Sequence, residues 1–207
     1  ASPRVPASTA KLLTATAALD TMDPQTTLPT TVVAGAAANE IVLVGGGDMM
    51  LAAGAGDPSA VVGHAGMADL AAQVAKDLQL RGTTSVRLRV DDTLFSGPRV
   101  APGWTAGEVN VGYVAPVAPL AVNIAKVRDG EYVPRVSDPA LSAATIFAKR
   151  LAEAGITVVG SPTRGAAPEG ARVLGRVESA PLADIVRYTL TTSDNTIAEV
   201  LGRLVAV

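Results

Sequence analysis

Residues 6–22, PASTAKLLTATAALDTM, decide the fold, and they predict a helix. Pro6 pre-sets the helix entry, Ser8 can cap it, and leucines farther along supply an apolar stripe. Ser8 and Lys11 stand three residues apart, so a helix turns both side chains to one face. A serine hydroxyl is a weak nucleophile until a base removes its proton. Because His64 is the only histidine, Lys11 is the base that the sequence offers to Ser8.

Lys11 can act as a base only when its amine is neutral. Burial and nearby positive potential both lower the pKa of a lysine, and a helix N-terminus supplies such potential. Ser8 is expected at that terminus. The plainer interpretation is an N-cap serine beside a surface lysine. Alone, the pair is therefore a weak indication of catalysis.

A second polar group, Ser193-Asp194-Asn195, stands just before the last predicted helix, which begins at Thr196. Serine, aspartate and asparagine are favoured N-cap residues, so a structural interpretation exists here too. The functional interpretation puts the Ser193 hydroxyl on the proton path to a leaving amine and lets the Asn195 amide hold a substrate carbonyl. Asp194 is then structural. Two such groups at two predicted helix starts strengthen each other.

Ser-x-x-Lys and Ser-x-Asn are two of the three active-site motifs of β-lactamases and penicillin-binding proteins. The third motif, Lys-Thr/Ser-Gly, does not occur in the 207 residues. The four lysines are instead followed by Leu12, Asp77, Val127 and Arg150. The sequence thus contains part of a known motif set and lacks the rest.

Composition excludes several classes of protein. Hydrophobic residues make up 48% and charged residues 17% of the chain, which is typical of one or two packed globular domains. A net charge of -2 argues against a nucleic-acid or anionic-membrane partner, and 3% aromatic residues are too few for base stacking. With no cysteine and one histidine, we expect no disulfide, no metal site and no Ser-His-Asp triad. The motifs of the chain imply no organic cofactor. The glycines at 45–47 lack the Gly-Lys-Ser/Thr of a phosphate loop.

Hydrophobic periodicity and turn residues predict the other elements. Residues 95–121 are rich in glycine and proline and are predicted to be an ordered loop, and residues 160–171 to be a linker. We expect strands at 32–34, 40–44, 86–90, 156–159 and 173–177, and helices at 67–80, 137–154 and 181–190.

Six stretches in this order resemble the low-molecular-mass class C penicillin-binding proteins, the D-alanyl-D-alanine carboxypeptidases and endopeptidases of peptidoglycan. They are PASTAKLLT at 6–14, LVGGGD at 43–48, VDDTLF at 90–95, PGW at 102–104, SDPA at 137–140 and SDNTIAE at 193–199. The likeness covers nearly the whole chain, and the frequent alanine and valine are similar to actinobacterial members. It implies an α/β (α+β) fold: an incomplete serine transpeptidase domain of the penicillin-binding-protein/β-lactamase type with an inserted β-rich α+β lobe.

The resemblance also implies a division of the chain. Residues 1–31 and 171–207 would belong to the catalytic domain, and residues 32–170 to the inserted lobes. Ser8 and Ser193 are 185 positions apart, whereas class A β-lactamases place the two motifs much closer. The stretch 123–136 is short, so one lobe usual in the family is expected to be reduced.

Site residues follow from the resemblance by position. Ser8 would be the acylated nucleophile and Lys11 its general base, with Ser193 and Asn195 completing the pocket. In relatives an aspartate of the Asp-Asp-Thr-x-Phe region contacts the free amine of the substrate, and Asp91 or Asp92 is the candidate here. A strand-ending turn is the plainer interpretation of both aspartates.

The implied function is hydrolysis of the terminal D-Ala-D-Ala bond or of a peptide crosslink in the cell envelope, outside the cytoplasm. The implied partners are the peptidoglycan stem peptide and β-lactam antibiotics, and the protein would be secreted or anchored by a segment outside this chain. The alternatives are a non-catalytic peptidoglycan-binding module and a β-lactamase.

Two departures from the family pattern matter. Asp48-Met49-Met50 stands where members have Gly-Asp-Pro, and we expect only a local change of turn. Without Lys-Thr-Gly, the chain is expected to be a fragment that stops before this motif. Loss of one oxyanion donor typically costs about 100- to 1000-fold in rate, so the chain alone is expected to be inactive or feeble.

Overall fold

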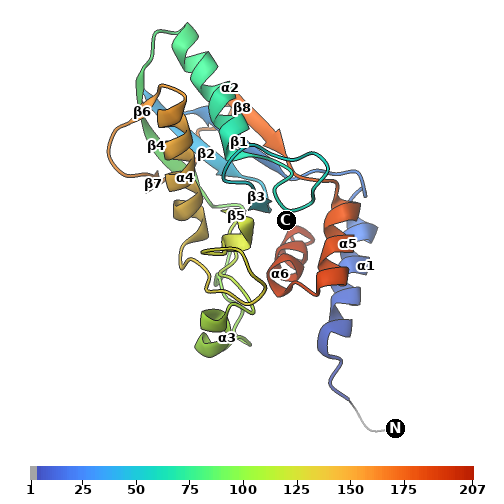
Figure 1. Cartoon of the computed structure of the whole chain (residues 1–207). Helices are drawn as coiled ribbons and strands as arrows, with labels where there is room; N and C mark the ends of the chain where they lie inside the picture. The colour runs from blue at the N-terminus through green and yellow to red at the C-terminus, as the bar shows by residue number, and fades with distance from the viewer. Residues whose placement is uncertain (1–3) are drawn as a thin grey trace.

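A computed structural model describes residues 4–207 of the chain (Figure 1). Residues 1–3, which the sequence assigns to the catalytic part, lie outside the described residues. A twisted sheet with two covering helices forms one end of the molecule, and a group of helices forms the other (Figure 1).

The main sheet has six strands in the order β6-β4-β2-β1-β8, with β7 also paired to β4. β1 runs antiparallel to β2 and β8, while β2 and β4 are parallel. A parallel pair needs a crossover, and the helix α2 lies in the connection between β2 and β4. The strands are β1 (Pro29–Ala34), β2 (Glu40–Gly45), β4 (Ser85–Asp91), β6 (Thr157–Val158), β7 (Thr163–Arg164) and β8 (Val173–Glu178).

Two long helices, α2 (Met67–Leu80) and α4 (Pro139–Glu153), pack against each other and against this sheet. Their apolar residues recur at helical spacing, and Leu70, Val74, Phe147 and Leu151 are fully buried there. Asp138 caps α4 by accepting the backbone N–H of Leu141, and a proline follows at the first helical position. Both helices were predicted, and the structure confirms them.

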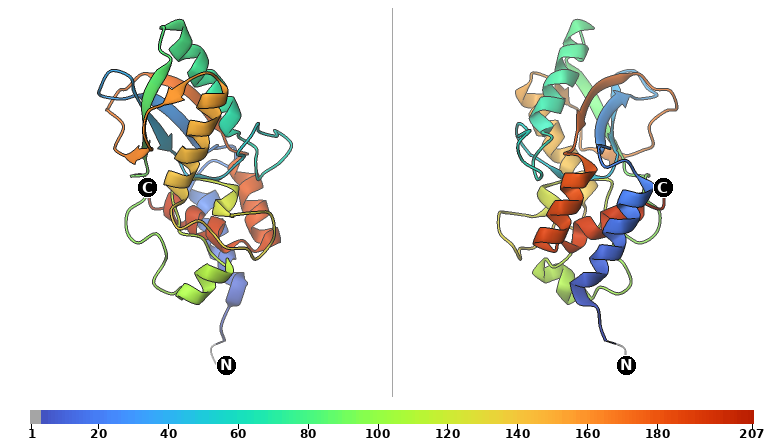
Figure 2. Two further views of the ribbon diagram at one scale, coloured as in Figure 1. Left: turned by 60° about the vertical axis from the view of Figure 1, so that its left-hand side comes forward. Right: turned by 90° about the vertical axis from the view of Figure 1, so that its right-hand side faces the viewer.

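The second core joins α1 (Lys11–Thr21), α5 (Leu182–Thr192) and α6 (Asn195–Leu204), which lie beside one another below the sheet (Figure 2). A two-stranded sheet of β3 (Asp48–Leu51) and β5 (Leu120–Val122) adds Met49 and Met50 to it. The remaining elements are the 3-10 turns η1 (Ala7–Ala10) and η2 (Asn123–Ala125) and the helix α3 (Ala106–Val111). Ser8 and Lys11 lie in η1 and at the start of α1, and Ser193 and Asn195 lie at the junction of α5 and α6.

The prediction of a loop over residues 95–121 was wrong, because α3 and the start of β5 lie within it. A capping box starts α3: the Thr105 hydroxyl accepts the N–H of Glu108, and the Glu108 carboxylate accepts the N–H of Thr105. Thr-x-x-Glu is a readable signature of such a start. The glycines and prolines around it hid the signal.

The predicted boundaries between catalytic and inserted parts stay a prediction. β8 falls in the stretch 171–207 assigned to the catalytic part, yet it pairs with β1 in the main sheet. Conversely, β3 and β5 fall in the assigned insert but pack with α1, α5 and α6. The two cores therefore share chain segments on both sides of the predicted boundaries.

Asp48, the first residue of β3, is 1% exposed, and its Oδ1 accepts the Met50 N–H at 2.7 Å. Burial raises the pKa of this carboxyl to about 7, and the hydrogen bond from Met50 acts in the opposite direction. In the folded chain the group therefore keeps its proton between pH 4 and 7, whereas an unfolded chain ionises it near its ordinary value, about 4. Folded stability then falls as pH rises through this window, because the folded state binds more protons.

Asp48→Asn, which keeps the acceptor for Met50, removes this pH dependence. Relative to the wild type, the variant is expected to gain up to about 4 kcal/mol in unfolding free energy between pH 4 and pH 8. Urea unfolding of both proteins across this range measures the difference. A difference that stays constant with pH would contradict the assignment.

Candidate active site

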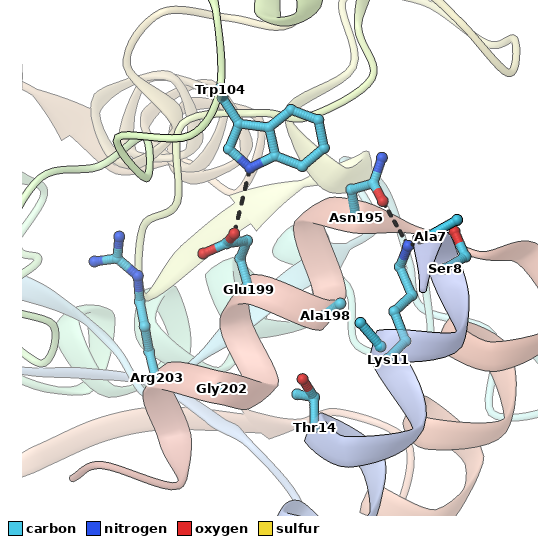
Figure 3. A pocket seen from close by; sticks show the side chains of 11 residues that line it. Ala7, Ser8, Lys11, Thr14, Trp104, Asn195, Ala198, Glu199, Gly202 and Arg203 are labelled. Carbon is cyan, nitrogen blue, oxygen red and sulfur yellow. Dashed lines mark hydrogen bonds between the residues drawn. The ribbon is translucent and has the colours of Figure 1, made fainter. Parts of the chain in front are cut away.

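The four motif side chains predicted to form the site meet at one place. The Lys11 Nζ lies 3.1 Å from the Ser8 Oγ and 3.3 Å from the Ser193 Oγ. It also donates to the Asn195 Oδ1 at 2.6 Å, and the Ser193 hydroxyl donates to the Ser8 Oγ at 2.7 Å. Figure 3 shows Lys11 pointing from its helix toward Ser8 and Asn195. We call this group the Ser8 cluster.

Local backbone structure places each member of the Ser8 cluster. Ser8 lies in the 3-10 turn before α1, just after Ala7, whose φ is +49°. Ser193 ends α5 in the left-handed region with φ +55°, and this reversal lets α6 begin at once. Asp194 caps α6 by accepting the Ile197 N–H at 2.9 Å, which is the structural role expected for it.

The interpretation of Ser8 as a helix cap was wrong. Neither η1 nor α1 has a side-chain cap hydrogen bond in the described structure. The Ser8 hydroxyl is exposed and contacts Lys11 and Ser193 instead. Its hydrogen bonds therefore serve the cluster and not the helix start.

Lys11 is half-buried between the two helix starts. Burial lowers the pKa of its ammonium group, and the charge of Asp194 partly counteracts this effect. A lowered pKa makes the neutral amine more accessible, as a lysine base requires. The direction of the shift agrees with the expected role.

Two hollows flank the Ser8 cluster. One, of about 720 Å³, is lined by α1, α6 and Trp104, with Lys11, Thr14 and Glu199 facing it (Figure 3). The other, of about 660 Å³, shares Ser8 and Asn195 with the first but is otherwise lined by different residues. Tyrosines and charged residues line the second hollow, among them Tyr113, Lys126, Tyr132, Arg135 and Tyr188. A peptide chain could thus extend in either direction from the Ser8 hydroxyl.

The Asn195 amide is fixed at both ends, by Lys11 and by a backbone carbonyl. Its Nδ2 donates to the carbonyl oxygen of Tyr113 at 3.0 Å. Arg135 holds the preceding carbonyl, that of Gly112, through Nε at 3.2 Å and Nη2 at 2.9 Å. No residue type indicates this support, because a backbone carbonyl can belong to any residue.

Arg135 also donates through Nη1 to the Ile124 carbonyl at 2.7 Å. Ile124 is the middle of η2, where Asn123, Ile124 and Ala125 have φ values of +48°, +53° and +56°. Such left-handed backbone costs energy for residues with a side chain at Cβ, above all for a β-branched one. Arg135 thus joins this strained turn to the segment that holds Asn195.

Gly112 ends α3 with φ +91°, a conformation that favours glycine. A Cβ at this position would lie 1.9 Å from the Val133 carbonyl oxygen. Gly112→Ala is therefore expected to destabilise the fold by about 3 kcal/mol, measured by urea unfolding. Gly103→Ala is the matched control, since a Cβ there meets nothing within 4 Å. Equal stability of the two variants would contradict the prediction.

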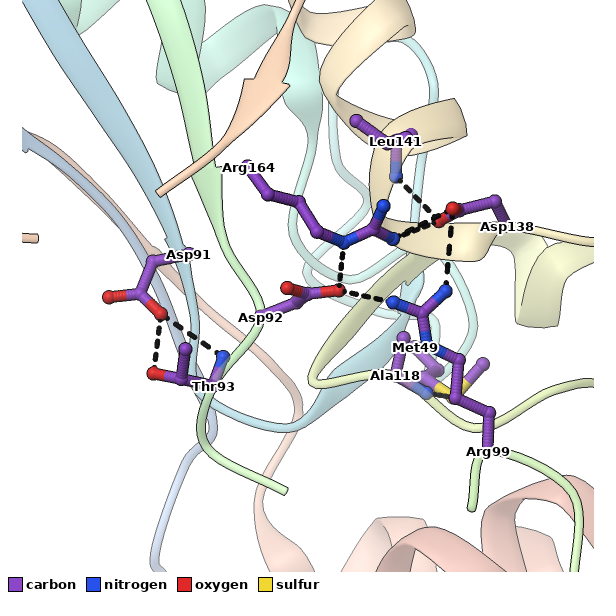
Figure 4. Close-up of polar contacts among 9 residues, drawn as sticks. All are labelled: Met49, Asp91, Asp92, Thr93, Arg99, Ala118, Asp138, Leu141 and Arg164. Carbon is purple, nitrogen blue, oxygen red and sulfur yellow. Dashed lines mark hydrogen bonds and ion pairs between the residues drawn. The ribbon is translucent and has the colours of Figure 1, made fainter. Parts of the chain in front are cut away.

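The hydrogen-bond partners of Asp91 and Asp92 in residues 4–207 are not members of the Ser8 cluster. Figure 4 shows the side chains around both aspartates. Asp91 accepts the N–H and hydroxyl of Thr93 and the N–H of Ala167. Burial would raise the pKa of this carboxyl, but those hydrogen bonds outweigh it and the pKa lies below its usual range. The carboxylate of Asp91 therefore closes a turn at the end of β4, as the plainer interpretation has it.

Asp92 pairs with two arginines, Arg99 at 2.8 Å and Arg164 at 2.9 Å (Figure 4). Both arginines also reach Asp138 at the start of α4. In the described part of the chain, neither Asp91 nor Asp92 lines the two hollows beside Ser8. Their expected contact with substrate stays a prediction.

Residues 4–207 contain no group of three or more side chains suited to hold a metal ion. No helix in this range is long and apolar enough to cross a membrane.

Two curated relatives match 99% of the chain. A carboxypeptidase of Mycobacterium tuberculosis is 39% identical over 211 residues, and carboxypeptidase DacB of Mycolicibacterium smegmatis is 37% identical over 209 residues. The match covers 44% of either relative, so the chain spans less than half their length. Both are mycobacterial, as the resemblance to actinobacterial members implies.

A solved structure shows the same fold. Penicillin-binding protein 4 from Haemophilus influenzae superposes with a TM-score of 0.73 at 19% identity, over 98% of this chain and 57% of that one. The mixed α/β fold class expected from the sequence is thereby confirmed. The family model of the D-Ala-D-Ala carboxypeptidase 3 (S13) peptidases matches residues 1–134 and 125–207. The chain therefore belongs to the S13 family of D-Ala-D-Ala carboxypeptidases.

Proposed function

We propose that the protein containing this chain is a serine D-alanyl-D-alanine carboxypeptidase and endopeptidase that cleaves peptidoglycan stem peptides through an acyl-Ser8 intermediate. One observation carries the proposal: the Lys11 Nζ and the Ser193 Oγ both lie within hydrogen-bond distance of the Ser8 Oγ. A nucleophile, a base and a proton carrier are therefore already in contact.

The first half of the reaction forms the acyl-enzyme. Neutral Lys11 takes the Ser8 proton, and the Ser8 Oγ attacks the carbonyl carbon of the penultimate D-alanine. The tetrahedral intermediate collapses as the C–N bond breaks, and the proton on Lys11 passes through Ser193 to the departing amine. The second hydrogen of the Asn195 Nδ2, beside the one given to Tyr113, is available to a substrate carbonyl.

The second half of the reaction releases the shortened peptide. A water molecule gives a proton to Lys11 and attacks the ester carbonyl carbon, and the Ser8 Oγ leaves and regains a proton. Cleavage of a terminal D-Ala-D-Ala bond and of a crosslink differ only in the amine that departs. The same machinery therefore serves carboxypeptidase and endopeptidase activity.

The resemblance implies that the strand with Lys-Thr/Ser-Gly supplies one of the N–H donors that stabilise the developing oxyanion. Since no Lys-Thr/Ser-Gly occurs in the 207 residues, the isolated chain is expected to acylate about 100- to 1000-fold more slowly than a protein that supplies this donor. Full activity is therefore proposed for a protein of the relatives' length.

We expect β-lactams to acylate Ser8, because they present a strained amide to the same nucleophile. A second structure of the Haemophilus influenzae protein, with a TM-score of 0.54, is complexed with a novel β-lactam, which supports this expectation. Because peptidoglycan lies outside the cytoplasmic membrane, we place the protein in the cell envelope. Stem peptides and β-lactams are its proposed partners.

The experiment is an intact mass spectrum with and without benzylpenicillin, for this chain and for the natural protein that contains it. The expected result is one adduct, mapped to Ser8 by peptide fragmentation, which persists for minutes or longer. Muropeptide binding by the longer protein without any adduct would replace the proposal with a non-catalytic binding module. Rapid loss of the adduct with turnover of the antibiotic would replace it with a β-lactamase.

A further inference from the structure

The helix α6 continues past the Ser8 cluster with two more side chains on the same face. Asn195, Glu199 and Arg203 are spaced by four residues, so they follow one another along the helix. All three line the 720 Å³ hollow beside Ser8 (Figure 3). Asn195 belongs to the Ser8 cluster, whereas Glu199 and Arg203 lie outside the Ser-x-x-Lys and Ser-x-Asn motifs.

Glu199 holds the Trp104 indole, which forms one wall of this hollow. Its Oε1 accepts the Trp104 Nε1–H at 3.3 Å, and both side chains are half-buried (Figure 3). An ionised carboxylate is a stronger acceptor than a neutral one. The bond joins segments 95 positions apart, so it fixes a loop to the helix of the site.

Arg203 holds the same loop one turn farther on. Its Nη1 donates to the Ser96 carbonyl at 3.2 Å and its Nη2 to the Pro98 carbonyl. The guanidinium also lies 5.9 Å from the centre of the Phe95 ring. Three contacts of one side chain thus fix the beginning of the loop that leads to Trp104.

The loop itself is loosely packed near Trp104. A Cβ added at Gly97 or Gly103 would meet nothing within 4 Å, so these segments face open space. A loop with few packed neighbours depends on the side chains that hold it. Arg99, in the middle of the loop, is also held by Asp92 and Asp138. The indole itself is held by its hydrogen bond to Glu199, so its place depends on α6.

We propose that Glu199 and Arg203 are positioning residues that hold Trp104 as a wall of the substrate pocket beside Ser8. The helix that presents Asn195 then also sets the width of the pocket, and so the size of the substrate group that reaches Ser8. This inference rests on the proposed function only in treating the hollow as a substrate pocket.

Trp104 is the only tryptophan of the chain, so its fluorescence reports this wall directly. The experiment measures acrylamide quenching and the emission maximum of the wild type, Glu199→Ala, Glu199→Gln, Arg203→Ala and the control Glu169→Ala in the exposed linker. Glu199→Ala and Arg203→Ala are expected to raise the quenching constant about twofold and shift the emission to the red, because the indole becomes more exposed. Glu199→Gln keeps an acceptor oxygen and is expected to restore most of the wild-type signal, and the control to match it.

Unchanged quenching in Glu199→Ala, with a wild-type circular dichroism spectrum, would overturn the proposal. If that variant folds poorly, the Glu199→Gln signal and a double-mutant cycle by urea unfolding decide. In a Trp104→Phe background, Glu199→Ala is expected to cost less stability than in the wild type. An equal cost in both backgrounds would also overturn the proposal.

The readout separates this inference from the proposed function. Suppose that the fluorescence of the variants changes as expected, but the longer protein forms no adduct with benzylpenicillin. This result would support the positioning role of Glu199 and Arg203 and count against peptidase activity. An adduct on Ser8 together with unchanged quenching in Glu199→Ala would support peptidase activity and overturn the positioning role.

Discussion

Replacing Ser8 with alanine is expected to abolish acylation by benzylpenicillin and release of D-alanine from stem-peptide substrates. No other hydroxyl of the Ser8 cluster can substitute, because Ser193 is placed to donate its proton to Ser8 and to relay protons. The fold should hardly change: Ser8 is exposed and caps no helix, so the loss of unfolding free energy is expected to stay within about 0.5 kcal/mol. Intact mass spectrometry and urea unfolding of the longer protein check both statements.

The matched control for this substitution is Thr9→Ala. Thr9 is the next residue in the same turn, and its hydroxyl donates to the Pro6 carbonyl instead of joining the cluster. This variant should keep acylation at nearly the wild-type rate. An adduct that survives in Ser8→Ala would show that another side chain is acylated and would end the assignment of Ser8.

Replacing Lys11 with methionine is expected to slow acylation by about 100- to 10 000-fold, the usual contribution of a general base. Methionine preserves most of the length of the side chain but cannot accept the Ser8 proton. The wild-type rate should rise with pH and level off once Lys11 is neutral. Because burial lowers the pKa of Lys11, this rise should come below the pH at which an ordinary lysine titrates. Acylation rates measured across pH 5 to 10 test the expectation.

Lys76→Met, an exposed substitution on α2, serves as the control and should leave the pH profile unchanged. A Lys11→Met variant with the same acylation rate and the same pH profile as the wild type would assign the base to another group. Retention of the profile at a uniformly lower rate would give Lys11 an electrostatic role in place of proton transfer.

Much of the candidate site could be predicted from the sequence, because its chemistry depends on side chains of particular types. Ser8, Lys11, Ser193 and Asn195 form two short patterns, and each pattern implies which side chains must meet. The main helices were likewise readable from their apolar spacing. The contacts that bring the two patterns together are tertiary, yet they follow once both patterns are assigned to one site.

Other features of the fold and the candidate site could not be predicted from the sequence, for physical reasons. All four residues of β3 are buried, so it shows no alternation, and it contains the charged residue Asp48. The Tyr113 carbonyl that fixes Asn195 is a backbone atom without any sequence signal. Asp92 was readable as a chemical group but not as a partner, because Arg164 lies 72 positions away.

The hydrogen bond between Ser193 and Ser8 has a consequence for the time at which function appears. It joins positions 185 residues apart, and β1 also pairs with the distant strand β8, for example Pro29 with Glu178. Contacts of such separation form slowly, since the chain must first lose the entropy of closing a long loop. During synthesis, Ser8 and Lys11 emerge well before Ser193 and Asn195, so the Ser8 cluster cannot form until the later two residues have left the ribosome. We therefore expect the serine to stay chemically quiet in nascent and misfolded chains, so that reactivity toward a β-lactam reports completed folding.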